Sequence, residues 1–256
     1  MDLTSKLSRR GFLARLSAAG GALMLGGCDQ LSQSPTFRDI LSKAEGATQR
    51  VQRFVLSRRS MAREFSESDL SANFKANGSI NVDDPSYQTQ AKEGFSNWRL
   101  KVDGLVVRPT ELSLDELRRL PSRTQITRHD CVEGWSAIGK WKGAQLAPLL
   151  QSVGLKPEAR YLVFHCADTL APNAHYYESI DLIDAFHPQT ILAYDMNDAA
   201  LAIPHGAPIR LRVERQLGYK HAKYVMRIEA VSSLALIGAG NGGFWEDRGY
   251  EWYAGI

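Results

Sequence analysis

The stretch Arg128-His129-Asp130-Cys131-Val132-Glu133-Gly134-Trp135 brings a thiol, two bases, two acids and a glycine together. Residues 124–131 favour a strand, so the stretch is predicted to run from a strand into a loop, where functional side chains commonly lie. The residues alone leave three interpretations of Cys131 open: a buried inert thiol, a nucleophile paired with a histidine, or a soft metal ligand. The neighbouring Arg128 and His129 are expected to lower the pKa of the Cys131 thiol.

A second polar region extends from His205-Gly206-Ala207-Pro208-Ile209-Arg210 to Gly218-Tyr219-Lys220-His221-Ala222-Lys223-Tyr224. Its glycines permit close approach of the backbone, and its basic side chains are donors suited to a phosphate or pyrophosphate. Apolar and polar residues alternate over 209–213, which predicts a strand with one buried and one polar face. For Arg212 and Arg215, a place on a solvated surface is the alternative. Neither a Walker motif nor G-x-G-x-x-G occurs, so a nucleotide-binding fold is not supported.

The chain has 256 residues, of which 44% are hydrophobic, and a net charge of +3. This composition is that of a globular protein and excludes disordered, collagen-like and disulfide-dense classes. The first 27 residues hold four of the 31 basic and one of the 28 acidic side chains, so the remainder is neutral. Bulk charge therefore gives no reason to expect nucleic-acid binding.

Residues 1–27 carry the order of features that an export signal needs. Ser8-Arg9-Arg10-Gly11-Phe12-Leu13 resembles a twin-arginine signature and precedes a Gly/Ala-rich apolar segment, an ordinary amphipathic helix being the alternative. Leu25-Gly26-Gly27-Cys28 resembles a lipobox, which predicts lipidation of Cys28 rather than plain cleavage to a soluble product. We therefore expect a periplasmic protein, exported by the twin-arginine route and anchored to the inner membrane only through Cys28.

Hydrophobic periodicity and turn residues predict a mixed α+β fold with a heavy β share. Residues 28–95 are expected to form a linker and a helical and polar extension, whose helix over 37–55 packs on the body. Ser113 and Glu116 form a capping box that opens a short helix. A hairpin is predicted around Asp103-Gly104. Further helices are predicted over 146–153 and 181–186, and strands over 98–103, 105–107, 124–131, 161–166, 191–194, 201–203, 209–213 and 225–237.

From about residue 98 onward, the chain resembles the molybdopterin-binding domain of the sulfite oxidase family, and within it the periplasmic methionine-sulfoxide reductases. Three ordered motifs carry the resemblance: residues 130–135 with Trp141, residues 205–210 and residues 218–224. It implies a single β-rich α+β domain over 96–256 with molybdopterin as cofactor. By the same resemblance Cys131 is the catalytic residue and the metal ligand, and Arg210 with residues 221–223 holds the pterin phosphate. The cofactor-binding candidates are Asn77, His129, Cys166, His205, Arg210, Lys220, His221, Ala222 and Lys223, with a loop cap as the alternative for His129.

Two departures from the family pattern bear on function. His205 stands where the reductases have Asn, and residues 132–135 replace the Gly-Asn-Arg-Arg type of segment that binds an oxyanion in sulfite oxidases. The resemblance thus implies oxygen-atom transfer with a small-molecule or protein-bound sulfoxide, a sulfite-type oxidase being an alternative. A redox partner at the inner membrane, a haem or flavin protein, or a soluble cytochrome, is implied as well.

Three competing functions stay open on the residues. The chain could be a non-catalytic periplasmic lipoprotein that retains the scaffold. Cys131 and Cys166 could act as a thiol–disulfide pair, although no C-x-x-C motif is present. A zinc site from His129, Cys131, His165 and Cys166 is conceivable by residue type, but the spacing is not that of zinc ligands. The aromatic stretch 245–253 could line a substrate mouth or clasp the sheet.

Overall fold

The computed structural model describes residues 33–172 and 174–256. These fall into two compact units, one ending at Gln52 and the other formed by Arg53–Ile256. The predicted export signal and the predicted lipidation site at Cys28 lie outside the described residues, and the predicted domain boundaries stay a prediction. Among the helices of the described part, none is both long enough and apolar enough to span a membrane.

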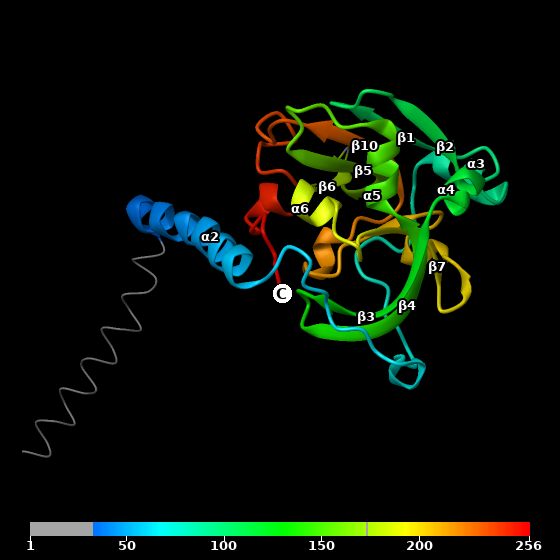
Figure 1. The fold of residues 1–256 in the computed structure, drawn as a ribbon, viewed down its shortest axis with the longest axis horizontal. Coiled ribbons are helices and arrows are strands. Elements are labelled where there is room, and N and C mark those ends of the chain that lie inside the picture. Colours follow the sequence, from blue (N-terminus) through cyan, green and yellow to red (C-terminus); the bar gives the residue numbers. More distant parts are fainter. Residues whose placement is uncertain (1–32, 173) are drawn as a thin grey trace, which may run out of the picture. The chain divides into compact units, whose positions relative to one another are not determined.

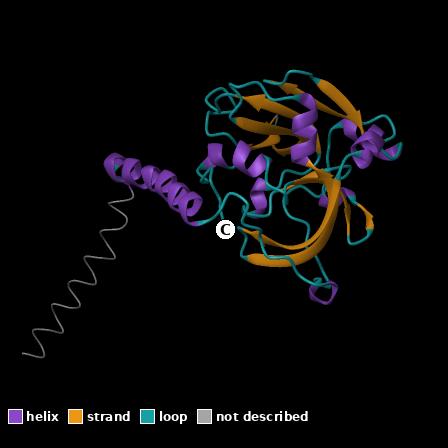
Figure 2. Ribbon diagram, in the orientation of Figure 1, coloured by secondary structure: helices purple, strands orange, loops and turns teal. Residues whose placement is uncertain are grey.

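The second unit is built on two five-stranded sheets (Figures 1 and 2). One sheet has the order β2-β1-β10-β5-β6, and in it only the β1/β10 pair is parallel. Its strands are β1 (Arg99–Gly104), β2 (Thr110–Ser113), β5 (Tyr161–Ala171), β6 (Ala174–Asp181) and β10 (Val225–Val231). The other sheet has the order β3-β4-β7-β8, with β9 paired to β7. Its strands are β3 (Ser122–Cys131), β4 (Trp135–Gln145), β7 (Ile191–Met196), β8 (Ala199–Ala200) and β9 (Arg210–Arg212).

Short helices connect these strands, and α2 precedes them. The α-helices are α2 (Pro35–Val55), α3 (Pro85–Lys92), α4 (Leu114–Arg119), α5 (Leu146–Val153) and α6 (Leu182–Ala185), and the 3-10 turns are η1 (Glu67–Asp69), η2 (Ile203–His205), η3 (Gly218–Lys220) and η4 (Glu246–Arg248). The predicted capping box opens α4, because Ser113 N donates to Glu116 Oε2 over 2.8 Å and Glu116 N donates to Ser113 Oγ over 3.2 Å. The fold is thus α+β and rich in strands, as the sequence predicts.

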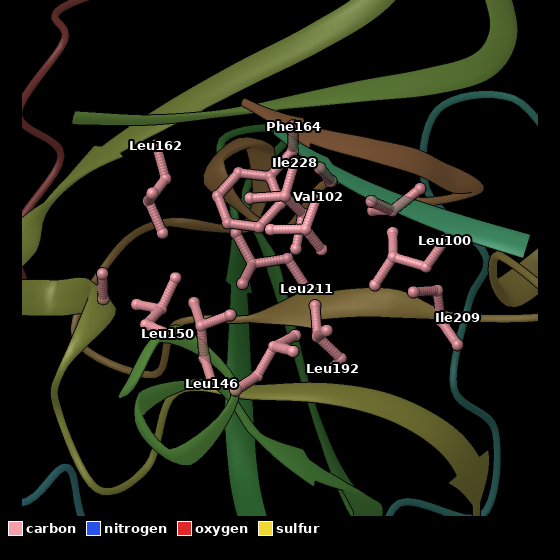
Figure 3. Packing of buried hydrophobic residues seen from close by; sticks show 14 of the residues in the cluster. Leu100, Val102, Leu146, Leu150, Leu162, Phe164, Leu192, Ile209, Leu211 and Ile228 are labelled. Carbon is pink, nitrogen blue, oxygen red and sulfur yellow. The ribbon is translucent and has the colours of Figure 1, made fainter. Parts of the chain in front are cut away.

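The main hydrophobic core lies between the two sheets (Figure 3). Leu100, Val102 and Phe164 come from one sheet, whereas Leu192 and Leu211 come from the other. The apolar face of α5 fills the same layer. Removing this apolar surface from water is the main stabilising contribution to the domain. Leu211 fixes β9 in this core, and β3 is held by its pairing with β4 over Ser122–Cys131.

The tight turn predicted at Asp103-Gly104 is wrong. The chain returns antiparallel to β1 only as β2, where Thr110 pairs with Val102, and residues 105–107 form no strand, since Val106 makes only an isolated bridge to Leu155. Gly104 instead lies beside β10: a Cβ there would lie 2.3 Å from the carbonyl oxygen of Ala230, so this position requires glycine. The strands β2, β4 and β6 and the helix α3 were not predicted from the sequence.

The polar face predicted for β9 is present, but it is buried and not exposed to solvent. Arg210 and Arg212 are both 0% exposed, and all three residues of the strand are buried. Alternation of apolar and charged residues therefore marks two buried faces here, one against the apolar core and one against a polar interior.

Candidate functional site

Cys131 ends β3 at the tight turn into β4. Cys131 and Trp135 are paired in the strand register, and Gly134 N donates to the carbonyl oxygen of Cys131 over 3.0 Å. Gly134 has a positive φ of 83°, a conformation that glycine adopts readily. Two long paired strands thus hold the thiol at a fixed position at the end of the sheet.

The Cys131 side chain is half-buried in the wall of a pocket. The pocket has about 680 Å³ of empty space, part of it open to solvent. Its polar lining includes Asn77, Ser79, Cys131, Asp168, His221 and Lys223. Its aromatic lining includes Tyr176, Tyr219, Trp245 and Tyr250.

The structure brings four of the predicted site residues into this wall: Asn77, Cys131, His221 and Lys223. The other candidates, His129, Cys166, His205, Arg210, Lys220 and Ala222, are not part of the wall. His129 and Arg210 stand directly behind it, because the His129 and His221 ring centroids are 5.2 Å apart and Arg210 donates to the carbonyl oxygen of His221 over 3.3 Å. They therefore form a second layer of basic groups.

The prediction that basic neighbours lower the pKa of the Cys131 thiol is wrong. Burial raises the pKa of Cys131, and the negative charge of Glu133 adds to the effect. Arg128 instead pairs with Asp130, with 2.9 Å between Nε and Oδ1. Burial, and then the positive charge of Arg212, hold the pKa of His129 well below its ordinary value, so this ring is neutral. Without a bound metal, Cys131 is accordingly a thiol.

Arg210 and Lys223 are buried cations in the same part of the site. Burial and the neighbouring Arg212 lower the pKa of Arg210 to about 9. Burial and Arg210 lower the pKa of Lys223 to about 7. The Lys223 ammonium donates to the carbonyl oxygens of Asn77 (2.6 Å), Pro204 (2.9 Å) and Ser79. Neither cation has a carboxylate within ion-pair distance among the residues that the structure describes.

Arg212 and Arg215, for which a solvated position was the alternative, are both ion-paired and largely shielded. Arg212 contacts Glu214 with 2.6 Å between NH2 and Oε2, and both side chains are 0% exposed. Its NH1 lies 3.0 Å from His129 Nδ1, and its guanidinium lies over the Trp141 ring, 4.4 Å from the centroid. Arg215 contacts Asp184 over 2.6 Å. Arg212 therefore orients His129 rather than facing solvent.

Several buried polar atoms of this region have no hydrogen-bond partner within the described part of the chain. They include the donor or acceptor nitrogens His129 Nε2, His221 Nδ1, His205 Nδ1 and Arg210 Nε, and the oxygens Asn77 Oδ1 and Asp168 Oδ1. Leaving such groups unpaired costs about 1–3 kcal/mol each, so they are expected to have partners in the functional protein. A cofactor with several nitrogen and oxygen atoms and an anionic phosphate matches these groups, and the Cys131 thiol beside them matches its metal.

Lys220 has a different environment from the one predicted. Its ammonium donates to Glu178 Oε1 (2.5 Å) and to Glu246 Oε1 (2.6 Å), and all three side chains are buried. Burial raises the pKa of Glu178 well above its ordinary value, against the attraction of Lys220. The Lys220 side chain therefore joins β6 to η4 instead of facing the pocket.

The alternatives based on Cys166 gain no support. Cys166 is buried in β5, burial raises its pKa well above the ordinary value, and both Cys131 and Cys166 are free thiols. Within residues 33–172 and 174–256, no group of three or more His, Cys, Asp or Glu side chains could hold a metal ion. The predicted zinc alternative is therefore without a ligand set there.

Five residues of the pocket wall were not predicted from the sequence: Gly78, Leu170, and the polar residues Ser79, Asp168 and Tyr176. Ser79 Oγ donates to Asp168 Oδ2 over 2.7 Å, and burial raises the pKa of Asp168. No local motif marks these residues, since only the folding of β5, β6 and the segment around Asn77 brings them together. In contrast, the aromatic stretch 245–253 does supply pocket residues, Trp245 and Tyr250, as one of its two interpretations predicts.

Comparisons with known proteins agree with this geometry. The family model described as oxidoreductase molybdopterin binding domain matches residues 87–234. A putative protein-methionine-sulfoxide reductase subunit YedZ1 of Azospira oryzae is 36% identical over 97% of this chain and 88% of its own length. The protein-methionine-sulfoxide reductase catalytic subunit MsrP of Campylobacter jejuni is 30% identical over 65% of this chain and 60% of its own length.

The MsrP subunit of Xanthomonas axonopodis is 34% identical over 55% of this chain and 47% of its own length. The chain thus spans about half to three fifths of the length of these two subunits. The predicted cofactor, molybdopterin, and the predicted enzyme class, a molybdenum-dependent oxidoreductase, are confirmed. Since the family model matches more than half of the chain, this protein belongs to the oxidoreductase molybdopterin-binding domain family.

Proposed function

We propose that this chain is an exported reductase that removes the oxygen atom from sulfoxides, with Cys131 as the ligand to molybdenum. One observation carries the proposal: the Cys131 thiol is half-buried in a pocket backed by buried cations that lack carboxylate partners within the described residues. The similarity to methionine-sulfoxide reductase subunits supports the reaction class. When bound, the cofactor supplies a two-electron redox change coupled to the transfer of one oxygen atom.

The residues behind the thiol are suited to hold the organic part of the cofactor. Lys223 and Arg210 are proposed to bind its phosphate, because neither is in an ion pair within the described residues, and Asp168 and Glu214 attract them only from a longer distance. His129 and His221 each have one nitrogen without a partner there and are proposed to contact the pterin. Asn77 belongs to the same wall. The remaining candidates stay proposed contacts of the cofactor: Cys166, His205, Lys220 and Ala222. Lys220 is proposed to make its contact through the main chain, because its ammonium binds two carboxylates.

The pocket wall beside the thiol is suited to an uncharged substrate. Glu133 lies in this wall and forms an exposed ion pair with Lys75 over 3.2 Å, so the pair adds no net charge there. Residues 132–135 contain no arginine of the kind that binds an oxyanion in sulfite oxidases, and a sulfoxide carries no net charge. The aromatic rings of Trp245 and Tyr250 offer an apolar contact for the carbon groups of a thioether. Because the pocket is open to solvent, a methionine sulfoxide within a protein chain is a suitable substrate.

Reduction of a sulfoxide consumes two electrons and two protons and releases a thioether and water. The electrons must come from another protein, and we propose an inner-membrane haem or flavin protein or a soluble cytochrome. A periplasmic location after twin-arginine export, with a lipid at Cys28, would keep the enzyme near such a partner and raise the effective concentration. These features follow from the sequence and are part of the proposal.

The test uses protein matured in a host that makes the molybdenum cofactor. We expect about one molybdenum per chain and reduction of methionine sulfoxide, free or in an oxidised protein, with reduced benzyl viologen as electron donor. Cys131→Ser should lose the activity and part of the molybdenum, because a hydroxyl is a poor ligand for a soft metal site while the residues proposed to bind the pterin remain. Cys28→Ser, which removes a different thiol, should lose neither. Folded wild-type protein that is active without molybdenum would contradict the proposal.

A further inference from the structure

We propose that the N-terminal basic segment, residues 35–63, binds an anionic phospholipid bilayer. This binding is separate from the cofactor site and from any lipid at Cys28. It rests on three features of the described residues: an exposed apolar stripe, a concentration of positive charge, and an open groove that combines two arginines with an apolar floor.

The apolar stripe runs along one side of α2 and continues past its end. Phe37, Ile40, Ala44, Val51 and Val55 recur at intervals of three, four or seven residues and so share one helix face. The large side chains stay in water: Ile40 is 57% exposed, Val51 60%, Phe54 91% and Val55 71%. Leu56 and Met61 extend this exposed series beyond the helix.

Within the second unit, the last turn of α2 is fixed with its apolar residues outward. Arg53 NH2 lies 3.1 Å from Asp181 Oδ2 and 2.8 Å from Asp184 Oδ2, and these side chains are largely shielded from solvent. On the same turn, Phe54 and Val55 remain exposed. A double ion pair thus holds the turn on one side, while the opposite side keeps apolar surface in contact with water, which is unfavourable unless something covers it.

Positive charge is concentrated in the same segment. Residues 35–63 contain seven basic side chains and two acidic ones, a net charge of +5. Residues 64–256 contain 20 basic and 24 acidic side chains, a net charge of −4. A helix that is apolar on one face and basic on the other is typical of segments that lie in the interface of an anionic membrane.

A groove beside this segment has the chemistry of a phospholipid site. Arg58 and Arg59 border it, and its apolar wall consists of Leu182, Ile183, Phe186 and Pro188. Phe186 is itself exposed. Guanidinium groups bind phosphate oxygens, and the adjacent apolar wall can contact the upper part of an acyl chain.

Charge also argues against a second copy of the chain as the partner that covers the apolar stripe of this segment. A twofold symmetric contact would place this segment against itself. Two segments with a net charge of +5 each would then face one another, which is unfavourable. An anionic bilayer matches the apolar stripe and the charge at the same time.

The test measures flotation of the full chain with vesicles of phosphatidylglycerol mixed with phosphatidylcholine, against vesicles of phosphatidylcholine alone. All proteins carry Cys28→Ser, so that no acyl chain contributes and any effect of residues 1–27 is common to all. We expect binding to the anionic vesicles only, and loss of binding at high salt. Since each basic residue near such a surface changes binding by about fivefold, Arg58→Gln with Arg59→Gln should weaken it by about tenfold or more.

Phe54→Ser with Val55→Ser should abolish the remaining binding, because it removes the most exposed apolar contacts. The matched control is Leu236→Ser with Arg119→Gln, which removes an exposed leucine and an exposed arginine elsewhere and should bind as the background does. All variants should keep the benzyl viologen-linked activity in solution. Equal flotation of all variants, equal binding to neutral vesicles, or a dimer that only the Phe54/Val55 variant loses in sedimentation would overturn the proposal.

Discussion

The buried ion pair between Arg212 and Glu214 allows a direct test of how buried charge affects the stability of the fold. Glu214 Oε1 accepts from Arg212 Nε over 2.9 Å and from Gln125 Nε2 over 2.8 Å, and Glu214 Oε2 accepts from Arg212 NH2 over 2.6 Å. Glu214→Gln keeps the size of the side chain but removes its charge. The Arg212 guanidinium would then remain buried beside Arg210 without a counter-ion.

Removing one partner of a buried ion pair costs about 3–5 kcal/mol, because the remaining charge keeps its desolvation penalty. For a domain of about 200 residues this lowers the melting temperature by roughly 6–20 °C. Since Arg212 NH1 also contacts His129 Nδ1, the variant is expected to bind molybdopterin more weakly as well.

The measurement is thermal and urea unfolding of the wild type, Glu214→Gln, and a double variant with Arg212→Met and Glu214→Leu. The double variant replaces the pair by apolar side chains and should recover much of the lost stability, because no isolated charge remains. If Glu214→Gln lowers the free energy of unfolding by less than about 1 kcal/mol, the reasoning is refuted. So small a loss is what a solvent-exposed salt bridge contributes, and it would mean that water screens this pair. Failure of the double variant to recover would show that the packing of the guanidinium on Trp141 matters more than charge balance.

Three further predictions concern separate parts of the fold. His187 is buried and its pKa is lowered to about 4, mainly by burial, so it stays neutral in the folded protein while the unfolded chain takes up a proton near pH 6.5. The free energy of unfolding should thus fall between about pH 6.5 and 4, by up to about 3 kcal/mol, and His187→Gln should flatten this fall in urea titrations. Gly218→Ala should reduce molybdenum content and activity, because its Cβ would lie 2.5 Å from His129 Nε2, whereas Gly46→Ala, with open space around it, should change neither. Lys220→Met should destabilise the fold by about 3–5 kcal/mol by leaving Glu178 and Glu246 buried together, and a larger loss of molybdenum affinity than in Lys223→Met would show that Lys220 serves the cofactor after all.

The pattern of the sequence predicts the strand-rich α+β fold and several elements correctly. Ser113 and Glu116 cap α4 as expected because a capping box is local chemistry. The helix α5 also forms where its apolar spacing indicates. The long strand β4 was not predicted, because its residues Gly139 and Gly143 and its lysines have low β propensity. Gly143 is needed because the main chain of Leu192 comes too close to leave room for a Cβ.

The candidate site, too, was predicted from the sequence only in part. Local motifs led to Cys131, His221 and Lys223, and the pocket contains all three. They could not show that Arg212 is buried against Glu214 or that Lys220 binds Glu178, because both partnerships depend on the buried environment that folding creates. They also gave the wrong sign for the pKa of Cys131, since burial outweighs the charged neighbours along the sequence.

The central claim is that the sulfur of Cys131 binds molybdenum in the loaded enzyme. X-ray absorption at the molybdenum edge counts the sulfur neighbours of the metal directly. We expect the wild-type protein to show one more sulfur neighbour than Cys131→Ser protein that still retains some cofactor, with the remaining sulfurs unchanged. The same sulfur count in both proteins, or no molybdenum in an active wild-type enzyme, would contradict the claim.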